Sequence, residues 1–211
     1  MPLVRKPSSD DPAAAATEPT LQRIRDDLAS ADEQVRWDAA RAASGHAQFS
    51  GELARALATE TSPRVRGAMF TSLAQTADAQ AVAALQTLLR SDDANLRIGA
   101  LDALRLLVRD RPALVEPLLA DEDADVRILT CELVRELPAE RATALLAALL
   151  RHESEPNVCA AAIDVLAEAG DASALPVLGE CARRFAGTPF LGFAIDVATQ
   201  RLRAQTPRSR G

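Results

Sequence analysis

The stretch Asp123-Ala124-Asp125-Val126-Arg127-Ile128-Leu129-Thr130-Cys131 recurs, in altered form, along nearly the whole chain of 211 residues. Each copy has an apolar anchor at the position of Val126, and successive anchors are separated by 30, 31, 30, 32 and 33 residues. The anchors are Val35, Val65, Leu96, Val126, Val158 and Leu191. A period in this range indicates an array of stacked repeats rather than one globular core. Positions are counted below from the anchor of each repeat.

The composition favours helices throughout the array. Alanine and leucine dominate, aromatic residues make up 3% of the chain, and there is no tyrosine. Alanine and leucine are strong helix formers, whereas sheets are rich in β-branched and aromatic residues. We therefore expect an all-α protein.

A capping residue stands three positions before each anchor. These residues are Asp32, Ser62, Asp93, Asp123, Glu155 and Thr188. Asp, Ser and Thr side chains accept hydrogen bonds from the free N–H groups of a first helical turn, and Glu155 is the weakest cap of the set. Pro63, Pro156 and Pro189 occupy the next position, where a proline loses no helical hydrogen bond. A helix is therefore predicted to begin just before each anchor.

These anchor helices carry an apolar stripe at positions +4, +7 and +8, which is helical spacing. Together with the anchors, the clearest examples are Leu96, Ala100, Ala103 and Leu104; Val126, Thr130, Leu133 and Val134; and Val158, Ala162, Val165 and Leu166. Small residues at +4 and +7 allow neighbouring helices to approach closely. Each fully buried Leu or Val stabilises the fold by roughly 1.5–3 kcal/mol.

A less regular helix precedes each anchor helix. The expected ranges are 20–30, 51–59, 79–90, 112–120, 139–151 and 173–186. Pro117 falls inside the fourth range, so we expect that helix to be kinked or to begin late. The repeats then span residues 20–204, between a disordered leader at 1–19 and a disordered basic tail at 205–211.

The repeats resemble the HEAT-like repeat family, in the short bacterial form named after phycobilisome lyases. The shared pattern is Asp-x-x-Val-Arg-x-x-Ala followed by Ala-Leu, with Gly-Asp and Ala-Leu-Pro ahead of the next pair; it stands at 123–130, 96–104 and 169–176. The resemblance covers roughly residues 20–204 and implies a right-handed α-solenoid of about six two-helix HEAT-like repeats. Cys159 and Gly192 replace the arginine that follows the anchor, which suggests a capping repeat at the end.

Charge and composition limit the classes of function that the chain can have. A formal charge of −6 counts against a general nucleic-acid-binding surface. We find no apolar run long enough to span a membrane and no secretory signal pattern. Cys131, Cys159 and Cys181 lie in helical patterns and are interpreted as buried apolar residues of a reducing compartment. We expect a cytoplasmic protein.

An arginine follows the anchor in four repeats, at Arg36, Arg66, Arg97 and Arg127. One hypothesis is that this row binds acidic peptides or phosphates. The favoured hypothesis is the structural ladder that the resemblance implies, in which these arginines bond to Asp side chains and helix ends of adjacent repeats. Four arginines at one structural position indicate architecture.

No catalytic or metal-binding constellation is visible. Some HEAT-like proteins hold two irons with several His-Glu motifs, but this chain has one such pair, His152-Glu153, besides His46. His152 is expected at a helix C-terminus. We predict no metal and no cofactor.

The resemblance leaves enzyme hypotheses open. A bilin lyase-like enzyme would need a chromophore-sized cavity, and an oxidoreductase- or hydroxylase-like enzyme would need more metal ligands. A HEAT-like DNA glycosylase would need a basic, aromatic concave surface, whereas Trp37 is the one tryptophan of an acidic chain.

Two further rows of residues define a candidate partner-binding surface. Position +2 lies about 200° around the helix from the anchor, away from the apolar stripe. This +2 row comprises Trp37, Gly67, Ile98, Ile128, Ala160 and Phe193, and the neighbouring +6 row comprises Arg41, Thr71, Asp102, Glu132, Asp164 and Val197. We expect an apolar ridge, formed by Trp37, Ile98, Ile128 and Phe193, with an acidic flank formed by Asp102, Glu132 and Asp164. The competing interpretation is that packing between repeats covers the ridge.

The sequence therefore predicts a non-catalytic scaffold or adaptor. It would bind another protein, as a helix or a basic peptide, on the concave face that second helices line in HEAT-like solenoids. The ridge would provide apolar anchors, and the acidic flank would set the orientation of the partner.

Overall fold

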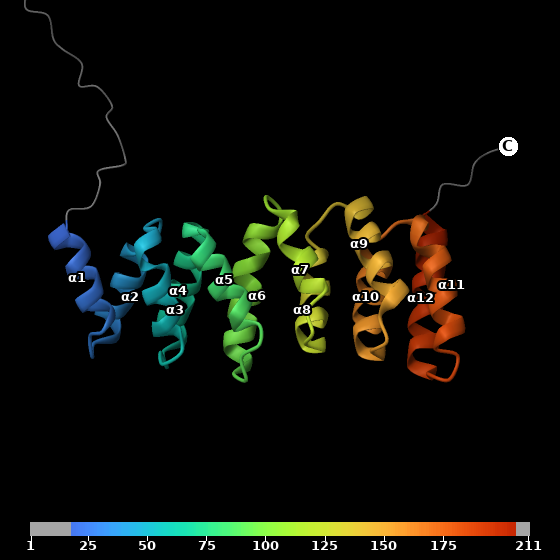
Figure 1. The fold of residues 1–211 in the computed structure, drawn as a ribbon, viewed down its shortest axis with the longest axis horizontal. Helices are drawn as coiled ribbons and strands as arrows, with labels where there is room; N and C mark the ends of the chain where they lie inside the picture. The colour runs from blue at the N-terminus through green and yellow to red at the C-terminus, as the bar shows by residue number, and fades with distance from the viewer. Residues whose placement is uncertain (1–17, 206–211) are drawn as a thin grey trace, which may run out of the picture.

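The computed structural model describes residues 18–205, and this part of the chain is a stack of α-helices without strands (Figure 1). The first helix of each repeat is α1 (Glu18–Leu28), α3 (Ser50–Leu57), α5 (Ala79–Leu88), α7 (Val115–Leu119), α9 (Ala139–His152) or α11 (Leu175–Arg184). The second is α2 (Glu33–Ala42), α4 (Pro63–Thr76), α6 (Ala94–Val108), α8 (Ala124–Val134), α10 (Pro156–Ala169) or α12 (Pro189–Gln205). Short 3₁₀ segments, Ala47–Phe49, Pro112–Leu114 and Ala172–Ala174, precede α3, α7 and α11.

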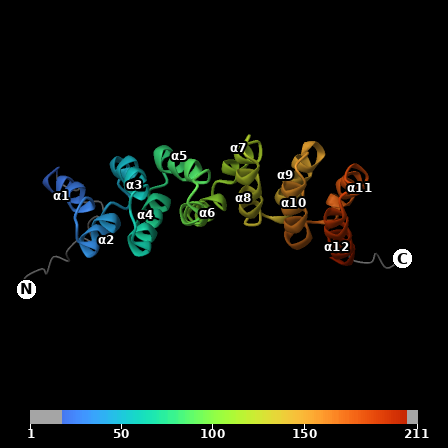
Figure 2. The same ribbon diagram turned by 90° about the horizontal axis from the view of Figure 1, so that it is seen from below.

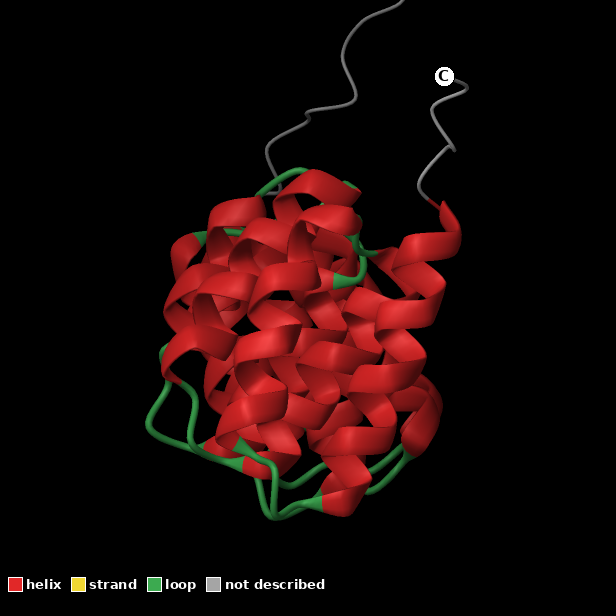
Figure 3. Cartoon of the chain, turned by 90° about the vertical axis from the view of Figure 1, so that its right-hand side faces the viewer, coloured by secondary structure: helices red, strands yellow, loops and turns green. Residues whose placement is uncertain are grey.

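The helices form two layers along a shallow arch. The odd-numbered helices make the outer, convex layer, and the even-numbered helices line the inner, concave side (Figure 2). Viewed along the long axis, successive repeats superimpose and the loops gather at the ends of the helices (Figure 3). The described residues therefore form an all-α solenoid of six two-helix repeats. The predicted leader at 1–19 and tail at 205–211 lie almost wholly outside the described residues.

The predicted caps begin the inner helices. Asp32 accepts hydrogen bonds from the N–H groups of Gln34 and Val35, at 2.7 and 3.3 Å. Ser62, Asp93 and Asp123 accept equivalent bonds in the next three repeats. Glu155 makes no side-chain cap bond, in agreement with its rank as the weakest cap. The free N–H groups of the first turn are thus satisfied by the residues expected from sequence.

The predicted stripe forms the core between the layers. All twelve stripe residues named for the third, fourth and fifth repeats are buried. Each inner helix packs on the next inner helix, from α2 on α4 to α10 on α12. The anchor Val35 is the exception, since it is only partly buried. The first repeat has no preceding inner helix among the described residues to cover it.

Pro117 shortens the outer helix of the fourth repeat, as predicted. The segment begins as the 3₁₀ turn Pro112–Leu114 and continues as the five-residue helix α7. Pro117 is the third residue of α7, where the backbone N–H would have no helical partner. The late helix start therefore accommodates the proline without a lost hydrogen bond.

Two leucines of α6 provide a matched test of the core. Leu104 is fully buried, whereas Leu106 is 65% exposed. We predict that Leu104→Ala lowers the free energy of unfolding by about 2–5 kcal/mol, because it leaves a cavity. Leu106→Ala should change it by less than about 0.5 kcal/mol. Chemical denaturation measures both, and equal losses would contradict this packing.

Candidate functional site

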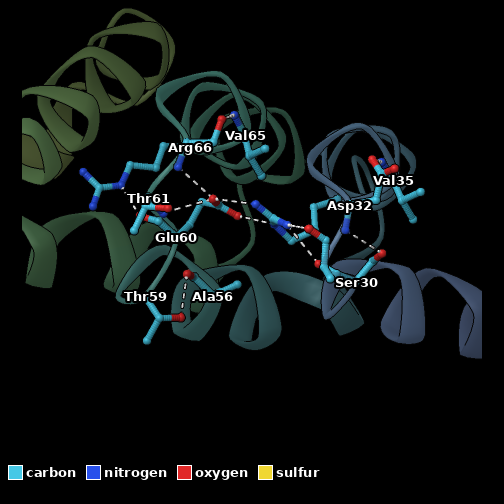
Figure 4. Close-up of polar contacts among 12 residues, drawn as sticks. Ser30, Asp32, Val35, Ala56, Thr59, Glu60, Thr61, Val65 and Arg66 are labelled. Carbon is cyan, nitrogen blue, oxygen red and sulfur yellow. Dashed lines mark hydrogen bonds and ion pairs between the residues drawn. The ribbon is translucent and has the colours of Figure 1, made fainter.

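The turn between the two helices of a repeat is organised by the residue five positions before the anchor. Glu60 Oε1 accepts hydrogen bonds from the N–H groups of Thr61 and Ser62, at 2.9 and 2.8 Å (Figure 4). Glu153 does the same for Ser154 and Glu155. In three other turns Ser30, Ser91 and Asp121 each accept a bond from the N–H of the capping residue. Sequence reasoning missed this row, although alignment of the repeats would have placed a polar side chain at −5 in five of them.

The arginine after the anchor joins each turn to the next repeat. Arg36 Nη1 donates to the carbonyls of Ser30 and Ala31, while its Nε and Nη2 donate to the two carboxylate oxygens of Glu60 at 2.7 and 3.1 Å. Arg127 repeats this pattern with Glu153, at 2.8 and 3.1 Å. Both carboxylates are buried. A two-point pair of this kind requires the planar fork of arginine.

The other two arginines of the row use different acceptors. Arg66 donates to the carbonyl of Glu60 at 2.6 Å and to Asp93 of the next repeat at 3.0 Å. Arg97 donates to the carbonyls of Ser91 and Asp92. The carboxylate at its expected partner position, Asp121, pairs instead with Arg90. All four arginines of the row thus donate hydrogen bonds within the fold, to turn carbonyls and, for Arg36, Arg66 and Arg127, to a carboxylate of the next repeat.

The pairs shift the pKa values of the two buried carboxyls. Hydrogen bonds from Arg36 lower the pKa of Glu60 below its ordinary value of 4.5. Burial by itself would raise the pKa of Glu153, but the bonds from Arg127 and from the turn N–H groups outweigh it and lower that pKa as well. Each charged carboxylate thus stabilises the folded chain.

The +2 row is exposed at some repeats and partly covered at others. Ile98 is 56% exposed and Phe193 is 74% exposed. Trp37 and Ala160 pack partly against the core, and Ile128 is also half-buried. The inner helices approach closely enough to cover the base of the row, while side chains at α6 and α12 project from it. The predicted ridge is therefore interrupted rather than continuous.

The acidic residues of the +6 row have arginine partners at +9. Arg105 lies 2.9 Å from Asp102 and 3.8 Å from Glu132. Arg135 lies 3.3 Å from both Glu132 and Asp164. The flank expected to be acidic is thus a mixed row of both charges. Arg105–Asp102 and Arg135–Glu132 lie within one helix, whereas Arg105–Glu132 and Arg135–Asp164 join neighbouring repeats. The expectation of an acidic flank did not take position +9 into account.

A pocket of about 750 Å³ lies between α2 and α4 on the concave face. Its lining residues are Trp37, Arg41, Ala42, Arg64, Gly67, Ala68, Thr71, Ser72 and Gln75. Trp37 contacts two guanidinium groups, with Cζ of Arg41 and of Arg64 at 4.6 and 4.3 Å from its ring centroid. These distances are those of cation–π contacts. Of the predicted site residues, the pocket contains Trp37 alone.

A smaller apolar cleft lies in the outer layer between α7 and α9. It measures about 200 Å³, and Leu119, Leu145 and Leu149 line it together with Ala148. An ion pair between Glu116 and Arg141 links the same two helices. This cleft exists because α7 has only five residues and leaves part of α9 uncovered.

The three cysteines are buried thiols, as predicted. Burial raises the pKa of Cys131 to about 12. Cys181 lies beside Cys159, whose thiol hydrogen bond, with the charge of Arg184, lowers the Cys181 pKa. Arg184 Nη2 is 3.5 Å from Cys181 Sγ. Because all three side chains are inaccessible to solvent, none is placed to act as a nucleophile on a bound molecule.

Histidine and carboxylate side chains are dispersed. His152 ends α9, as predicted for a helix C-terminal residue. Between residues 18 and 205, no group of three or more His, Cys, Asp or Glu side chains is arranged to hold a metal ion. Over the same range, no helix combines the length and apolar character needed to cross a membrane.

Stacked two-helix repeats with a continuous inner layer define an α-solenoid repeat protein. Residues 111–185, from the turn before α7 to the end of α11, match the family model described as HEAT repeats. The resemblance read from the anchor pattern is thereby confirmed in this part of the chain.

Solved structures of designed proteins are similar to this chain at low identity. Two engineered proteins from a structural genomics consortium are each 19% identical, over 87% of this chain and 96% or 98% of theirs, with a TM-score of 0.41. A designed armadillo repeat protein is 18% identical over 86% of this chain and 99% of its own, with a TM-score of 0.38. No curated protein matches the chain.

The buried Arg–Glu pairs predict how stability depends on pH. Since both folded carboxyls have pKa values below 4.5, their stabilisation is fully present above about pH 5 and is lost as the pH falls toward about 3. We predict that Glu60→Gln with Glu153→Gln lowers the free energy of unfolding at pH 7 by roughly 1–3 kcal/mol per site and flattens its acid dependence. Urea denaturation from pH 7 to about pH 3 measures this.

A matched control replaces two exposed glutamates, Glu122→Gln and Glu140→Gln. This control should keep most of the acid dependence of the wild type. If the free energy of unfolding fell equally with pH in the wild type and in the Glu60/Glu153 variant, groups other than these two carboxyls would control the pH dependence.

Two glycines of the inner helices provide a test of the pocket geometry. A Cβ at Gly67 would meet open space, whereas a Cβ at Gly99 would overlap the ring of Phe70. We predict that Gly67→Ala raises the free energy of unfolding by about 0.5–1 kcal/mol, because alanine favours a helix. Gly99→Ala should lower it, because the ring must shift. Thermal denaturation of both variants measures the signs, and a loss of stability in Gly67→Ala would contradict the open pocket.

Proposed function

We propose that this protein is a non-catalytic scaffold or adaptor that holds a partner protein along its concave face. The observation that carries the proposal is the exposure of Ile98 and Phe193, at equivalent positions of α6 and α12, on the inner face of a solenoid. A single exposed apolar side chain is ordinary, but two in register on a concave surface are suited to anchor one partner. The family match at residues 111–185 supports the scaffold itself and does not identify a partner.

The charges of the inner face favour a particular kind of contact. Each carboxylate of the +6 row from Asp102 to Asp164 already has an arginine partner, so a basic peptide would have to displace that arginine. We therefore propose that apolar side chains of the partner, presented by a helix or an extended segment, meet Ile98 and Phe193. The mixed charges beside them would orient the partner. The cytoplasm is the compartment we propose, since the three cysteines are thiols.

The lyase-like and hydroxylase-like alternatives have no specific observation in their favour. The largest pocket described, between α2 and α4, is lined by Trp37, two arginines and small or neutral polar residues, and its described lining contains no His, Cys or carboxylate side chain. The His and carboxylate side chains between residues 18 and 205 do not converge on one point. These alternatives stand on the resemblance alone.

Partner capture tests the proposed surface. Wild-type protein and the double variant Ile98→Arg, Phe193→Arg would serve as baits in native lysate, and each captured protein would be purified and its affinity measured. We expect a specific partner whose affinity falls about 100-fold or more in the double variant, because buried interface anchors contribute several kcal/mol. The stability of the variant should be unchanged, since both side chains are exposed.

Ala148→Arg is the control, because Ala148 is exposed in the outer cleft between α7 and α9. It adds the same type of charge to the convex side and should leave binding intact. Loss of binding in Ala148→Arg, with the inner-face variant unaffected, would move the partner to the outer cleft. Equal capture by all three baits would overturn the concave-face proposal.

A further inference from the structure

The pocket between α2 and α4 arises where the +2 row has no side chain. Gly67 occupies the position that Ile98 and Ile128 occupy in the next two repeats. Nothing lies within 4 Å of a Cβ added at Gly67. A glycine inside a helix costs about 0.5–1 kcal/mol relative to alanine. The cavity of about 750 Å³ is within the range of ligand pockets and far exceeds the size of a single ion.

The charged groups of this pocket are two guanidinium groups, which are hydrogen-bond donors. Arg41 and Arg64 are both exposed, and neither has a carboxylate partner in the part of the chain that the structure describes. Their guanidinium groups lie against Trp37, whose half-buried ring holds them at the pocket wall. Guanidinium and indole N–H groups donate and do not accept.

The neutral polar side chains of the pocket are hydrogen-bonded within the fold. Thr71 donates its hydroxyl proton to the carbonyl of Gly67 at 2.9 Å, and Ser72 donates to the carbonyl of Ala40 at 2.7 Å. Gln75 accepts a hydrogen bond from Ser44. Among the residues that the structure describes, no carboxylate lines the pocket beside its two cations, so a ligand that complements it must be anionic and must present acceptors to the guanidinium groups.

Charge and location narrow the class of anion. The pocket is lined by +2 and +6 positions of the inner helices α2 and α4, Trp37, Gly67, Arg41 and Thr71. The chain as a whole carries −6, which would repel an extended polyanion such as a nucleic acid. A short anionic segment satisfies both constraints. The carboxylates of a polypeptide present acceptor pairs that match a guanidinium fork.

We infer that this pocket binds an acidic segment of a partner polypeptide, with its Asp or Glu carboxylates on Arg41 and Arg64 and its backbone over Gly67. The inference rests on the proposed scaffold function and adds the chemistry of one contact. Ile98 and Phe193 anchor the partner further along the face, and the Trp37 pocket selects it by charge.

Trp37 provides the measurement, because it is the one tryptophan of a chain that has no tyrosine. The full chain would be titrated with an octaglutamate peptide at low ionic strength, with tryptophan fluorescence and the anisotropy of a labelled peptide as two readouts. We expect a saturable change that weakens as salt is added. An octalysine peptide of the same length should give none.

Three variants locate the contact. Arg41→Gln with Arg64→Gln should weaken the peptide about ten-fold or more, because charge-assisted bonds are lost. Gly67→Leu should weaken binding by placing a side chain where the peptide backbone would lie over Gly67, while both arginines remain. Arg55→Gln with Arg151→Gln removes the same charge from exposed residues of α3 and α9 on the outer layer and should retain most of the affinity. If the outer-layer variant lost as much affinity for the peptide as the pocket variant, net charge alone would explain the loss, and the inference would be overturned.

Other probes decide between anions. Inorganic phosphate that changes the tryptophan fluorescence at millimolar concentration, while the peptide does not change it, would reassign the pocket to a free anion. Single-stranded DNA that binds more tightly than the peptide would reassign it to nucleic acid. The peptide could fail to bind while a captured partner still depends on Ile98 and Phe193. That result would overturn this inference and leave the proposed function intact.

Discussion

The packing of each inner helix on the inner helix of the next repeat is the contact on which the rest of this structure depends. A two-helix repeat cannot bury both sides of its apolar stripe alone, so each repeat completes the core of its neighbour. Small stripe residues such as Ala100 and Ala162, both fully buried, permit the close approach. The inner layer is therefore continuous from α2 to α12, whereas the five-residue helix α7 leaves a cleft in the outer layer. The continuous layer presents equivalent positions of successive repeats in register on the concave face.

Arginine links between repeats accompany this packing. Within the described residues, most ion pairs between neighbouring repeats run forward, from an arginine to a carboxylate of the next repeat, as in Arg36–Glu60 and Arg127–Glu153. The same arginines bond to the carbonyls that end the preceding turn, so one side chain fixes the turn, the inner helix and the next repeat. These charged side chains therefore stabilise the stacking of the repeats. Arg41 and Arg64 are distinct because they face a pocket instead of a carboxylate.

Much of the fold could be predicted from sequence, because caps, prolines and the apolar stripe depend on local spacing. Asp32, for example, caps α2 through atoms only two and three residues away. The candidate site was predictable only in part. The exposure of Ile98 and the cover of Trp37 depend on how closely inner helices stack, which spacing does not specify. The pairing of Asp164 with Arg135 depends on the offset between repeats, and the pocket depends on a missing side chain at Gly67.

The central claim is that the concave face of the solenoid is the binding surface. Site-specific photo-crosslinking in cells tests it most directly, with a photoreactive amino acid placed at position 98, or at position 148 in the outer cleft. Both positions are exposed, so the reactive group is equally accessible at each. This account predicts one discrete protein adduct from position 98 and none from position 148. An adduct from position 148 alone, or none from either, would contradict it.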